Sequence, residues 1–231
     1  MKVIAHIYTE FPEKFGIPRQ SGLVERLLGK IVFEPEYRVA EAVKGLEEYS
    51  HIWILWKFSE AEREKWSPTV RPPRLGGKKR VGVFATRSPF RPNPIGLSSV
   101  KLEKIEYEEG LGPVIYVSGI DMLDGTPIYD IKPYLSYCDS HADAKCGFAD
   151  EVKEHVLSVA YEPELEKEVG KECMQTICDI LAQDPRTAYM DDEERIWGLT
   201  YMDCNIKFSV RGEELRIIEI VKVRNEDGNN N

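Results

Sequence analysis

The stretch HIWILWKF, residues 51–58, joins β-branched and aromatic side chains without a turn residue. Such a run is typical of a buried central strand. Further strand-like runs surround it, at residues 3–8, 30–33, 80–86, 97–106, 114–120 and 128–131. Many short strands, with one short helix predicted at residues 38–49, favour a sandwich or barrel over an alternating α/β sheet. We therefore expect a β domain over residues 1–145.

The pattern changes after residues 136–150, a polar loop that we interpret as a domain boundary. A strand is predicted at residues 152–161, followed by a helix from Pro163 to about Gln183 that begins with its proline and stops before Pro185. Three more strands are predicted at residues 195–201, 204–210 and 215–223. These elements indicate a small α+β domain over residues 150–225, and the polar residues 226–231 indicate a disordered tail. No G-x-G-x-x-G turn follows a strand, so a Rossmann fold is not expected.

The composition excludes several classes of protein. The 231 residues include 31 Lys and Arg and 40 Asp and Glu, a net charge of −9, and 42% hydrophobic residues, which is typical of a globular protein. No apolar run approaches the roughly 18–20 residues of a membrane-spanning helix, and the N-terminus lacks the apolar core of a signal peptide. Five cysteines without two-residue spacing indicate free thiols in a cytoplasm. The group formed by Cys138, Asp139, His141, Asp143 and Cys146 fits no common zinc pattern, so no metal site is predicted.

The charge is distributed unevenly. Residues 63–101 hold ten basic residues and one acidic residue, so this segment carries +9 and the rest of the chain −18. Six of the 14 prolines lie in the same segment and stiffen its loops. A rigid basic surface on an acidic body attracts a polyanion such as nucleic acid, with an affinity that falls with salt. The alternative is a solvated face paired with acids from elsewhere in the chain.

Two further segments carry candidate site residues. The segment SGIDMLDGTP, residues 118–127, leaves an apolar strand and enters a turn at Asp124-Gly125. Either its aspartates only cap the turn, or Asp121 and the strand end contact a ribose or a cationic ligand. A loop at residues 11–20 places Arg19 and Gln20, which can make bidentate contacts, beside the fixed backbone of Pro18.

Together, five blocks of sequence resemble the TsaA/TrmO family of S-adenosylmethionine-dependent tRNA methyltransferases. The blocks are FGIPRQ (15–20), LEEYSHIWILW (46–56), PTVRPPRLGG (68–77), VGVFATRSPFRPNPIG (81–96) and DMLDGTPIYDIKPY (121–134). LAQDPRTAY (181–189) extends the resemblance into the C-terminal domain of bacterial members. The family methylates N6 of N6-threonylcarbamoyladenosine, next to the anticodon. The resemblance implies a closed β-barrel, S-adenosylmethionine as cofactor, and a homodimer with cofactor sites near the subunit interface.

The resemblance also assigns residues. The cofactor contacts would be Pro18, Arg19, Gln20, Arg87, Leu97, Ser118, Gly119, Ile120 and Asp121. The tRNA contacts would be Arg71, Arg74, Lys78, Arg80, Arg91, Asn93, Lys132 and Tyr134, supported by the C-terminal domain. Where bacterial relatives often carry His-Gln, this chain has Ser59-Glu60, so no contact is assigned there.

Methyl transfer from a sulfonium is an in-line displacement that depends on holding donor carbon and acceptor nitrogen at roughly 3 Å, and it needs no metal. The N6 lone pair is delocalised into a urea-like group, so a hydrogen-bond acceptor near its N–H would help, and Asp124 is the catalytic candidate. Phe90 and Tyr134 could stack on an extruded base, or Phe90 could pack under its own loop.

Two other functions remain open at this point. The chain could be a non-catalytic RNA-binding module that keeps the basic segment without a donor pocket. It could also be a nucleotide hydrolase that uses Asp121 and Asp124 with a divalent metal, although the sequence offers no third acidic ligand at suitable spacing.

Overall fold

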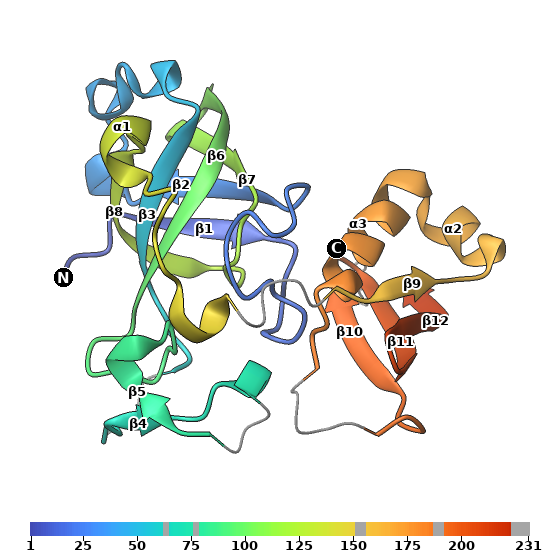
Figure 1. Cartoon of the computed structure of the whole chain (residues 1–231). Helices are drawn as coiled ribbons and strands as arrows, with labels where there is room; N and C mark the ends of the chain where they lie inside the picture. The colour runs from blue at the N-terminus through green and yellow to red at the C-terminus, as the bar shows by residue number, and fades with distance from the viewer. Residues whose placement is uncertain (62–64, 76–78, 151–155, 187–191, 223–231) are drawn as a thin grey trace.

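The computed structural model describes residues 1–61, 65–75, 79–150, 156–186 and 192–222, which form two units lying side by side (Figure 1). In the first unit, six strands close a barrel in the order β1-β2-β7-β6-β3-β8, and every neighbouring pair is antiparallel. The strands are β1 (Ala5–Thr9), β2 (Leu28–Phe33), β3 (His51–Lys57), β6 (Ile95–Glu108), β7 (Gly112–Ser118) and β8 (Thr126–Pro133). The prediction of a closed β-barrel rather than a Rossmann sheet is confirmed.

Strand β3 lies between β6 and β8, as its apolar sequence predicted, but only one of its faces is buried. Ile52, Ile54 and Trp56 point into the barrel and are at most 5% exposed. Trp53, on the outer face, is covered in part by the ring of Tyr134, 5.6 Å away between centroids. A barrel has a single interior, so a strand in its wall must alternate even where its sequence is apolar on both faces.

Two predicted elements take other forms. Residues 38–49 form no regular helix; they hold two 3₁₀ turns, η2 (Ala40–Val43) and η3 (Leu46–Glu48), separated by Gly45 with a φ of 84°. A third turn, η1 (Pro35–Tyr37), precedes them. The strand predicted at residues 80–86 is only β5 (Val81–Gly82), followed by the turn η5 (Val83–Ala85). Its partner β4 (Thr69–Val70) lies between Pro68 and Pro72, which lack the N–H needed to extend a ladder.

The second unit is a sheet in the order β10-β11-β12-β9 with helices on one side (Figure 1). Its elements are β9 (Ser158–Ala160), α2 (Pro163–Val169), α3 (Lys171–Ala182), β10 (Trp197–Tyr201), β11 (Cys204–Arg211) and β12 (Glu214–Lys222). The helix predicted from Pro163 is broken at Gly170, whose φ of 86° is outside the helical region. The small α+β unit is as predicted. Its helix α3 buries Met174, Ile177 and Leu181 in the core.

The remaining elements are short. The turn η4 (Pro73–Leu75) follows β4, while the helix α1 (Ser136–Asp139) and the turn η6 (Gly147–Ala149) come after β8 in the sequence and before β9. The disordered tail predicted at residues 226–231 lies outside the described residues, and the domain limits at 145 and 150 stay predictions. Among the described residues, no helix has the length and apolarity needed to span a bilayer.

Candidate active site

A carboxylate and a chain of hydrogen bonds lie where β7 leaves the barrel. The Ser98 hydroxyl donates to Asp121 Oδ1 over 2.6 Å, and the buried indole N–H of Trp56 donates to the same hydroxyl over 2.9 Å. Trp56 fits because residue 96 is glycine: a Cβ there would lie 2.1 Å from the indole atom Cε2. The packing of the barrel interior therefore fixes the position of the Asp121 carboxylate.

Asp121 has an unusual acidity. Burial raises the pKa of its carboxyl to about 6, although the hydroxyl of Ser98, the backbone at Ser21 and the positive charge of Arg87 all act to lower the pKa. A carboxylate kept in a poorly solvated position is available to a cationic or hydrogen-bond-donating ligand. This environment supports the ligand-contact interpretation of Asp121 over simple capping of a turn.

The structure brings together three of the segments to which the resemblance assigns cofactor contacts. Gly22 N donates to Gly119 O over 2.9 Å, which joins the loop after Gln20 to the end of β7. The Arg87 guanidinium donates to the side-chain oxygen of Gln20, which joins the basic segment to the same loop. Gly119 has a φ of 74°, where a side chain would be strained. Gln20, Arg87 and Asp121 therefore surround one end of the barrel.

The side chains of three other residues assigned to the cofactor do not join this group. Leu97 is 54% exposed and points outward, away from the inward-facing Ser98 that follows it in β6. The side chain of Ile120 is buried in the core, so only its backbone can reach a ligand at the barrel end. The Ser118 hydroxyl donates to Glu103 over 2.5 Å. The outward Leu97 side chain thus does not face Asp121 within one chain.

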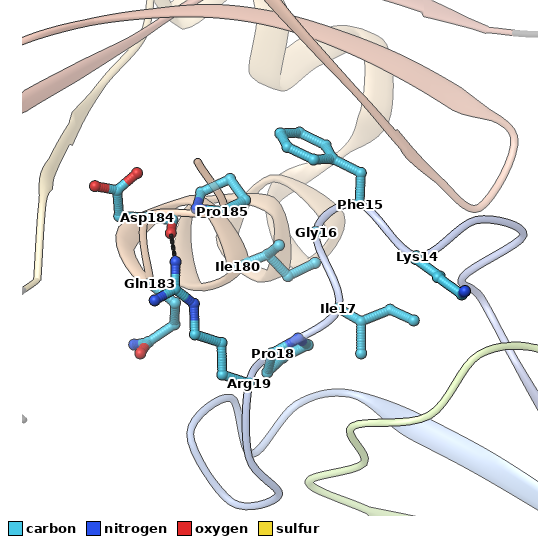
Figure 2. A pocket seen from close by; sticks show the side chains of 10 residues that line it. All are labelled: Lys14, Phe15, Gly16, Ile17, Pro18, Arg19, Ile180, Gln183, Asp184 and Pro185. Carbon is cyan, nitrogen blue, oxygen red and sulfur yellow. Dashed lines mark hydrogen bonds between the residues drawn. The ribbon is translucent and has the colours of Figure 1, made fainter. Parts of the chain in front are cut away.

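The loop that carries Pro18 and Arg19 also contacts the second unit. A cavity of about 300 Å³ lies between this loop and the end of α3 (Figure 2). Its lining is mostly apolar, with polar groups near Arg19: Lys14, Phe15, Gly16, Ile17, Pro18, Arg19, Ile180, Gln183, Asp184 and Pro185. The predicted cofactor residues Pro18 and Arg19 therefore belong to the junction of the two units as well as to the barrel.

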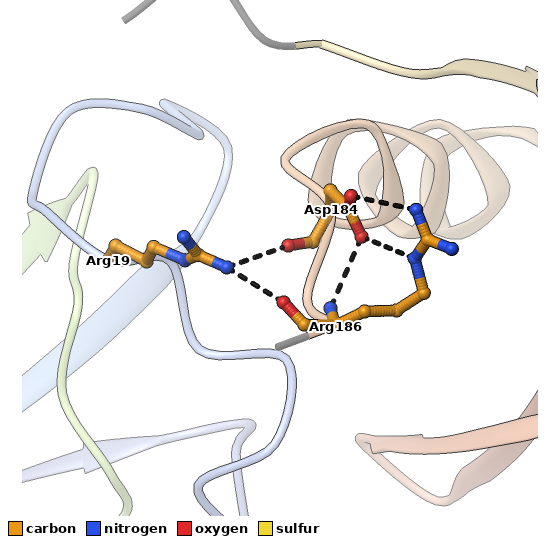
Figure 3. A network of polar contacts seen from close by, with 3 residues as sticks. All are labelled: Arg19, Asp184 and Arg186. Carbon is orange, nitrogen blue, oxygen red and sulfur yellow. Dashed lines mark hydrogen bonds and ion pairs between the residues drawn. The ribbon is translucent and has the colours of Figure 1, made fainter. Parts of the chain in front are cut away.

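Arg19 is held by the turn that follows α3 (Figure 3). Its Nη2 donates to the carbonyl oxygens of Asp184, at 3.2 Å, and Arg186, at 2.9 Å. The turn is braced by a bidentate pair in which Arg186 donates to the Asp184 carboxylate over 2.8 and 3.0 Å, with both residues buried. We did not assign Asp184 and Arg186 from the sequence; the Asp-Pro-Arg triplet in the resembling block was the available signal.

Residues 10–22, which we call the 10–22 loop, make further contacts with β10. The ring of Phe15 lies parallel to that of Trp197, at 6.1 Å between centroids, and Met202 N donates to Glu10 O over 2.9 Å. Gly16 has a φ of 98°, and a Cβ there would lie 2.0 Å from Leu199 Cδ1. The close approach and the left-handed backbone both require glycine at this position.

The residues assigned to tRNA fall into two groups. Arg71 and Asn93 are exposed in the segment between β3 and β6, where Arg80 donates to Thr69 Oγ1 over 3.0 Å and Arg91 to Thr86 O over 3.0 Å. Lys78 and the side chain of Arg74 lie outside the described part of the chain.

Lys132 and Tyr134 form the second group. Lys132, which pairs with Asp130 at 2.7 Å, is registered with Trp53, near the start of β3. The basic segment instead leaves β3 at its other end, after Lys57. The structure therefore does not bring Lys132 and Tyr134 together with the basic segment along β3.

Asp124 is hydrogen-bonded to the backbone near the end of β1. It is exposed, its Oδ1 accepts the backbone N–H of Thr9 over 2.9 Å, and its own N–H donates to Phe11 O over 3.0 Å. The carboxylate thus holds the end of β1 against the turn before β8. Within the described residues, no group of three or more His, Cys, Asp or Glu side chains is arranged to hold a metal ion.

Comparison with known proteins covers both units. Residues 6–140 match the family model for the tRNA-methyltransferase O N-terminal domain, and residues 153–223 match the TrmO C-terminal domain. A tRNA (adenine(37)-N6)-methyltransferase of Escherichia coli is 43% identical over 214 residues, covering 90% of each chain. A putative S-adenosylmethionine-dependent methyltransferase of Pseudomonas aeruginosa is 39% identical, covering 94% of this chain and 95% of the relative.

A solved structure is similar over the same extent. The crystal structure of TrmO from Pseudomonas aeruginosa superposes with a TM-score of 0.76 and 34% identity, covering 96% of this chain and 97% of that one. The likeness includes both the barrel and the second unit, since the coverage is nearly complete.

The raised pKa of Asp121 predicts how stability depends on pH. The folded protein holds this proton up to about pH 6, whereas the unfolded chain releases it near the ordinary aspartate pKa of 3.8. Asp121 therefore lowers the free energy of unfolding by about 3 kcal/mol as pH rises from about 4 to 6, with no further change above that. In denaturant titrations across this range, Asp121→Asn should lack the decline.

Ser98→Ala is the matched control for this prediction. It keeps the carboxyl but removes the hydroxyl that lowers its pKa, so the decline should extend to higher pH. A difference between wild type and Asp121→Asn that stays constant from pH 4 to 7 would contradict the assigned environment.

The contact between the 10–22 loop and β10 predicts a selective effect of one methyl group. Gly16→Ala should cost roughly 1–3 kcal/mol more than Gly45→Ala, because both positions have left-handed backbones but only Gly16 abuts Leu199. Hydrogen exchange should show lost protection of the Met202 amide in Gly16→Ala alone. Equal losses of stability in the two variants, with Met202 still protected, would show that the loop is not held there.

Proposed function

Because the chain belongs to the TrmO family of tRNA methyltransferases, we propose that it methylates N6 of N6-threonylcarbamoyladenosine, the modified adenosine directly 3′ of the anticodon. It is an S-adenosylmethionine-dependent tRNA (adenine-N6)-methyltransferase, as its relatives over nearly the whole length indicate. We also place the reaction in the cytoplasm, where its substrate is found. The observation that carries the proposal is the meeting of Gln20, Arg87 and Asp121 at one end of the barrel.

The residues at this end fit the cofactor. S-adenosylmethionine, when bound, supplies a methyl group on a positively charged sulfur that leaves as a neutral thioether. Above pH 6 the ionised Asp121 offers the negative charge that such a cation requires, and Ser98 keeps it in place. Gln20 and Arg87 supply amide and guanidinium groups beside it, and the backbone of Gly119 can be approached closely because it has no side chain.

The second unit acts on this site through Arg19. Methyl transfer depends on alignment of the reacting atoms, and displacements of about 1 Å can cost a hundredfold in rate. Arg19 belongs to the same loop as Gln20, and the carbonyls of Asp184 and Arg186 hold its guanidinium. We infer that the second unit orders the cofactor-binding loop.

Asp124 is our candidate for the group that accepts the N6 proton. The nitrogen loses this proton as the new N–C bond forms. Asp124 lies three residues after Asp121 and is exposed, so an RNA base extruded at the barrel end can reach it. Its bond to the backbone of Thr9 fixes the carboxylate without neutralising it.

Two partners complete the proposal. Arg71, Arg80, Arg91 and Asn93 would contact the phosphates of the anticodon loop, which the positive charge of their segment supports. A second copy of the chain would cover Leu97, which projects from the barrel wall with 54% of its surface exposed. A homodimer with the cofactor near its interface accounts for an assigned cofactor residue that points away from Asp121.

One experiment tests the reaction. The protein is incubated with S-adenosylmethionine labelled in its methyl group and with tRNA that carries or lacks the threonylcarbamoyl group, and the nucleosides are then separated. We expect label only in methylated N6-threonylcarbamoyladenosine. Label on unmodified tRNA alone would overturn the substrate assignment, and no label in either would indicate a non-catalytic RNA-binding module.

Asp124→Asn tests the proton acceptor. The amide oxygen can still accept the Thr9 N–H, so the fold should be kept while the base is lost. Single-turnover methylation should slow by roughly a hundredfold or more, with unchanged affinity for S-adenosylmethionine. Asp121→Asn should instead weaken the binding of S-adenosylmethionine. An Asp124→Asn rate equal to that of the wild type would remove this residue from the mechanism.

A further inference from the structure

Two large aromatic rings are exposed together on the segment that leaves the barrel between β3 and β6. Trp66 is 52% and Phe84 72% exposed, and their ring centroids lie 6.2 Å apart with 32° between planes. Trp66 precedes β4, and Phe84 lies in the turn η5 after β5. We call them the Trp66–Phe84 pair. Single exposed apolar residues are common on protein surfaces, but two adjacent aromatic rings form a flat apolar patch that a ligand can cover.

The backbone beneath this pair is held in place. Thr69 and Val70 pair with Gly82 and Val81, and Val83 N donates to Pro68 O over 3.0 Å. Thr86 N in turn donates to Val83 O over 3.1 Å, which closes the turn that carries Phe84. Little conformational entropy is therefore lost when a ligand covers the rings.

The surroundings of the pair are strongly basic. Between Lys65 and Lys101 the sequence has no Asp or Glu, and Arg71 directly follows β4 while Arg80 directly precedes β5. Aromatic rings among arginines are the combination that binds single-stranded nucleic acid, in which bases stack on the rings and phosphates contact the cations. If the ligand were instead a protein with an apolar surface, the positive charge around the two rings would have no partner.

The position of the pair indicates which part of an RNA it can meet. Phe84 lies three residues before Arg87, whose guanidinium binds Gln20 at the barrel end. Asp121 and Asp124, in contrast, follow β7. The pair is thus connected through its own segment to the proposed cofactor-binding end without belonging to it.

We propose that the Trp66–Phe84 pair is a stacking platform for an unpaired base of the anticodon loop that flanks the target adenosine. This inference rests on the proposed function and adds a contact to it. Stacking on the platform keeps the loop splayed while the target base is at the methyl donor. The sequence had suggested Phe90 and Tyr134 for stacking, but the ring of Tyr134 packs on Trp53 near the other end of β3.

Salt dependence separates stacking from charge. The affinity of the full-length protein for an anticodon stem-loop RNA carrying N6-threonylcarbamoyladenosine is measured at several salt concentrations. The double variant Trp66→Ala/Phe84→Ala should bind on the order of tenfold to a hundredfold more weakly, with an unchanged slope of log affinity against log salt. Arg71→Ala, which removes a phosphate contact, should instead reduce that slope by about one.

Three controls complete the design. Trp66→Phe should keep most of the affinity while losing the quenching of Trp66 fluorescence that RNA causes. Tyr107→Ala, which removes another exposed aromatic residue, should bind like the wild type. Circular dichroism and thermal unfolding check that the double variant is folded.

The outcomes are distinct. Wild-type affinity in the double variant, or a reduced salt slope, would overturn the platform. So would a change of association state in sedimentation, since the pair would then cover a second copy of the chain. If the wild type binds the RNA without methylating it and the double variant binds weakly, the proposed function fails while the platform stands. If the wild type does not bind, both fail.

Discussion

The 10–22 loop has to satisfy two partners at once, and the rest of the site depends on it. On one side, Gly22 bonds to the end of β7 at Gly119. On the other, Arg19 bonds to two carbonyls of the turn after α3. A buried ion pair such as Asp184 with Arg186 adds little net stability as a rule, because desolvation offsets attraction. Its effect here is geometric: it fixes the carbonyls that fix Arg19. The second unit is in this sense part of the candidate active site that we propose.

The charge pattern follows from the two ligands, which carry opposite charges. A sulfonium requires a negative group nearby, and the candidate for that group is the largely buried Asp121. A polynucleotide requires positive groups, and the sequence of residues 63–101 carries a charge of +9 on a body of −18. Arg87 lies between them: it bonds to Gln20 and lowers the pKa of Asp121. An acidic remainder repels a polyanion, which favours its binding at the basic segment.

The sequence predicted most strands, because alternation and β-branched residues are local signals. It predicted the barrel through resemblance more than through pattern, since six strands of this kind are equally typical of a sandwich. The helix expected at residues 38–49 was wrong because Gly45 turns the chain, and the break at Gly170 was missed for the same reason. Contacts such as Arg19 with Asp184 join residues 165 positions apart, which no local pattern indicates. The Trp66–Phe84 pair was missed because exposure is a property of the folded chain.

The narrowness of the barrel explains why its chemistry lies in loops. Six strands enclose little space, and Ile52, Ile54 and Trp56 already fill it, so no cofactor can enter. A ligand must instead bind at the end of the barrel, where segments distant in sequence meet. Loops are less ordered than strands, so a reaction that depends on alignment needs each loop to be braced from outside. The Trp56–Ser98–Asp121 chain, the Arg87–Gln20 bond and the turn beneath Arg19 are three such braces, and each anchors a different segment.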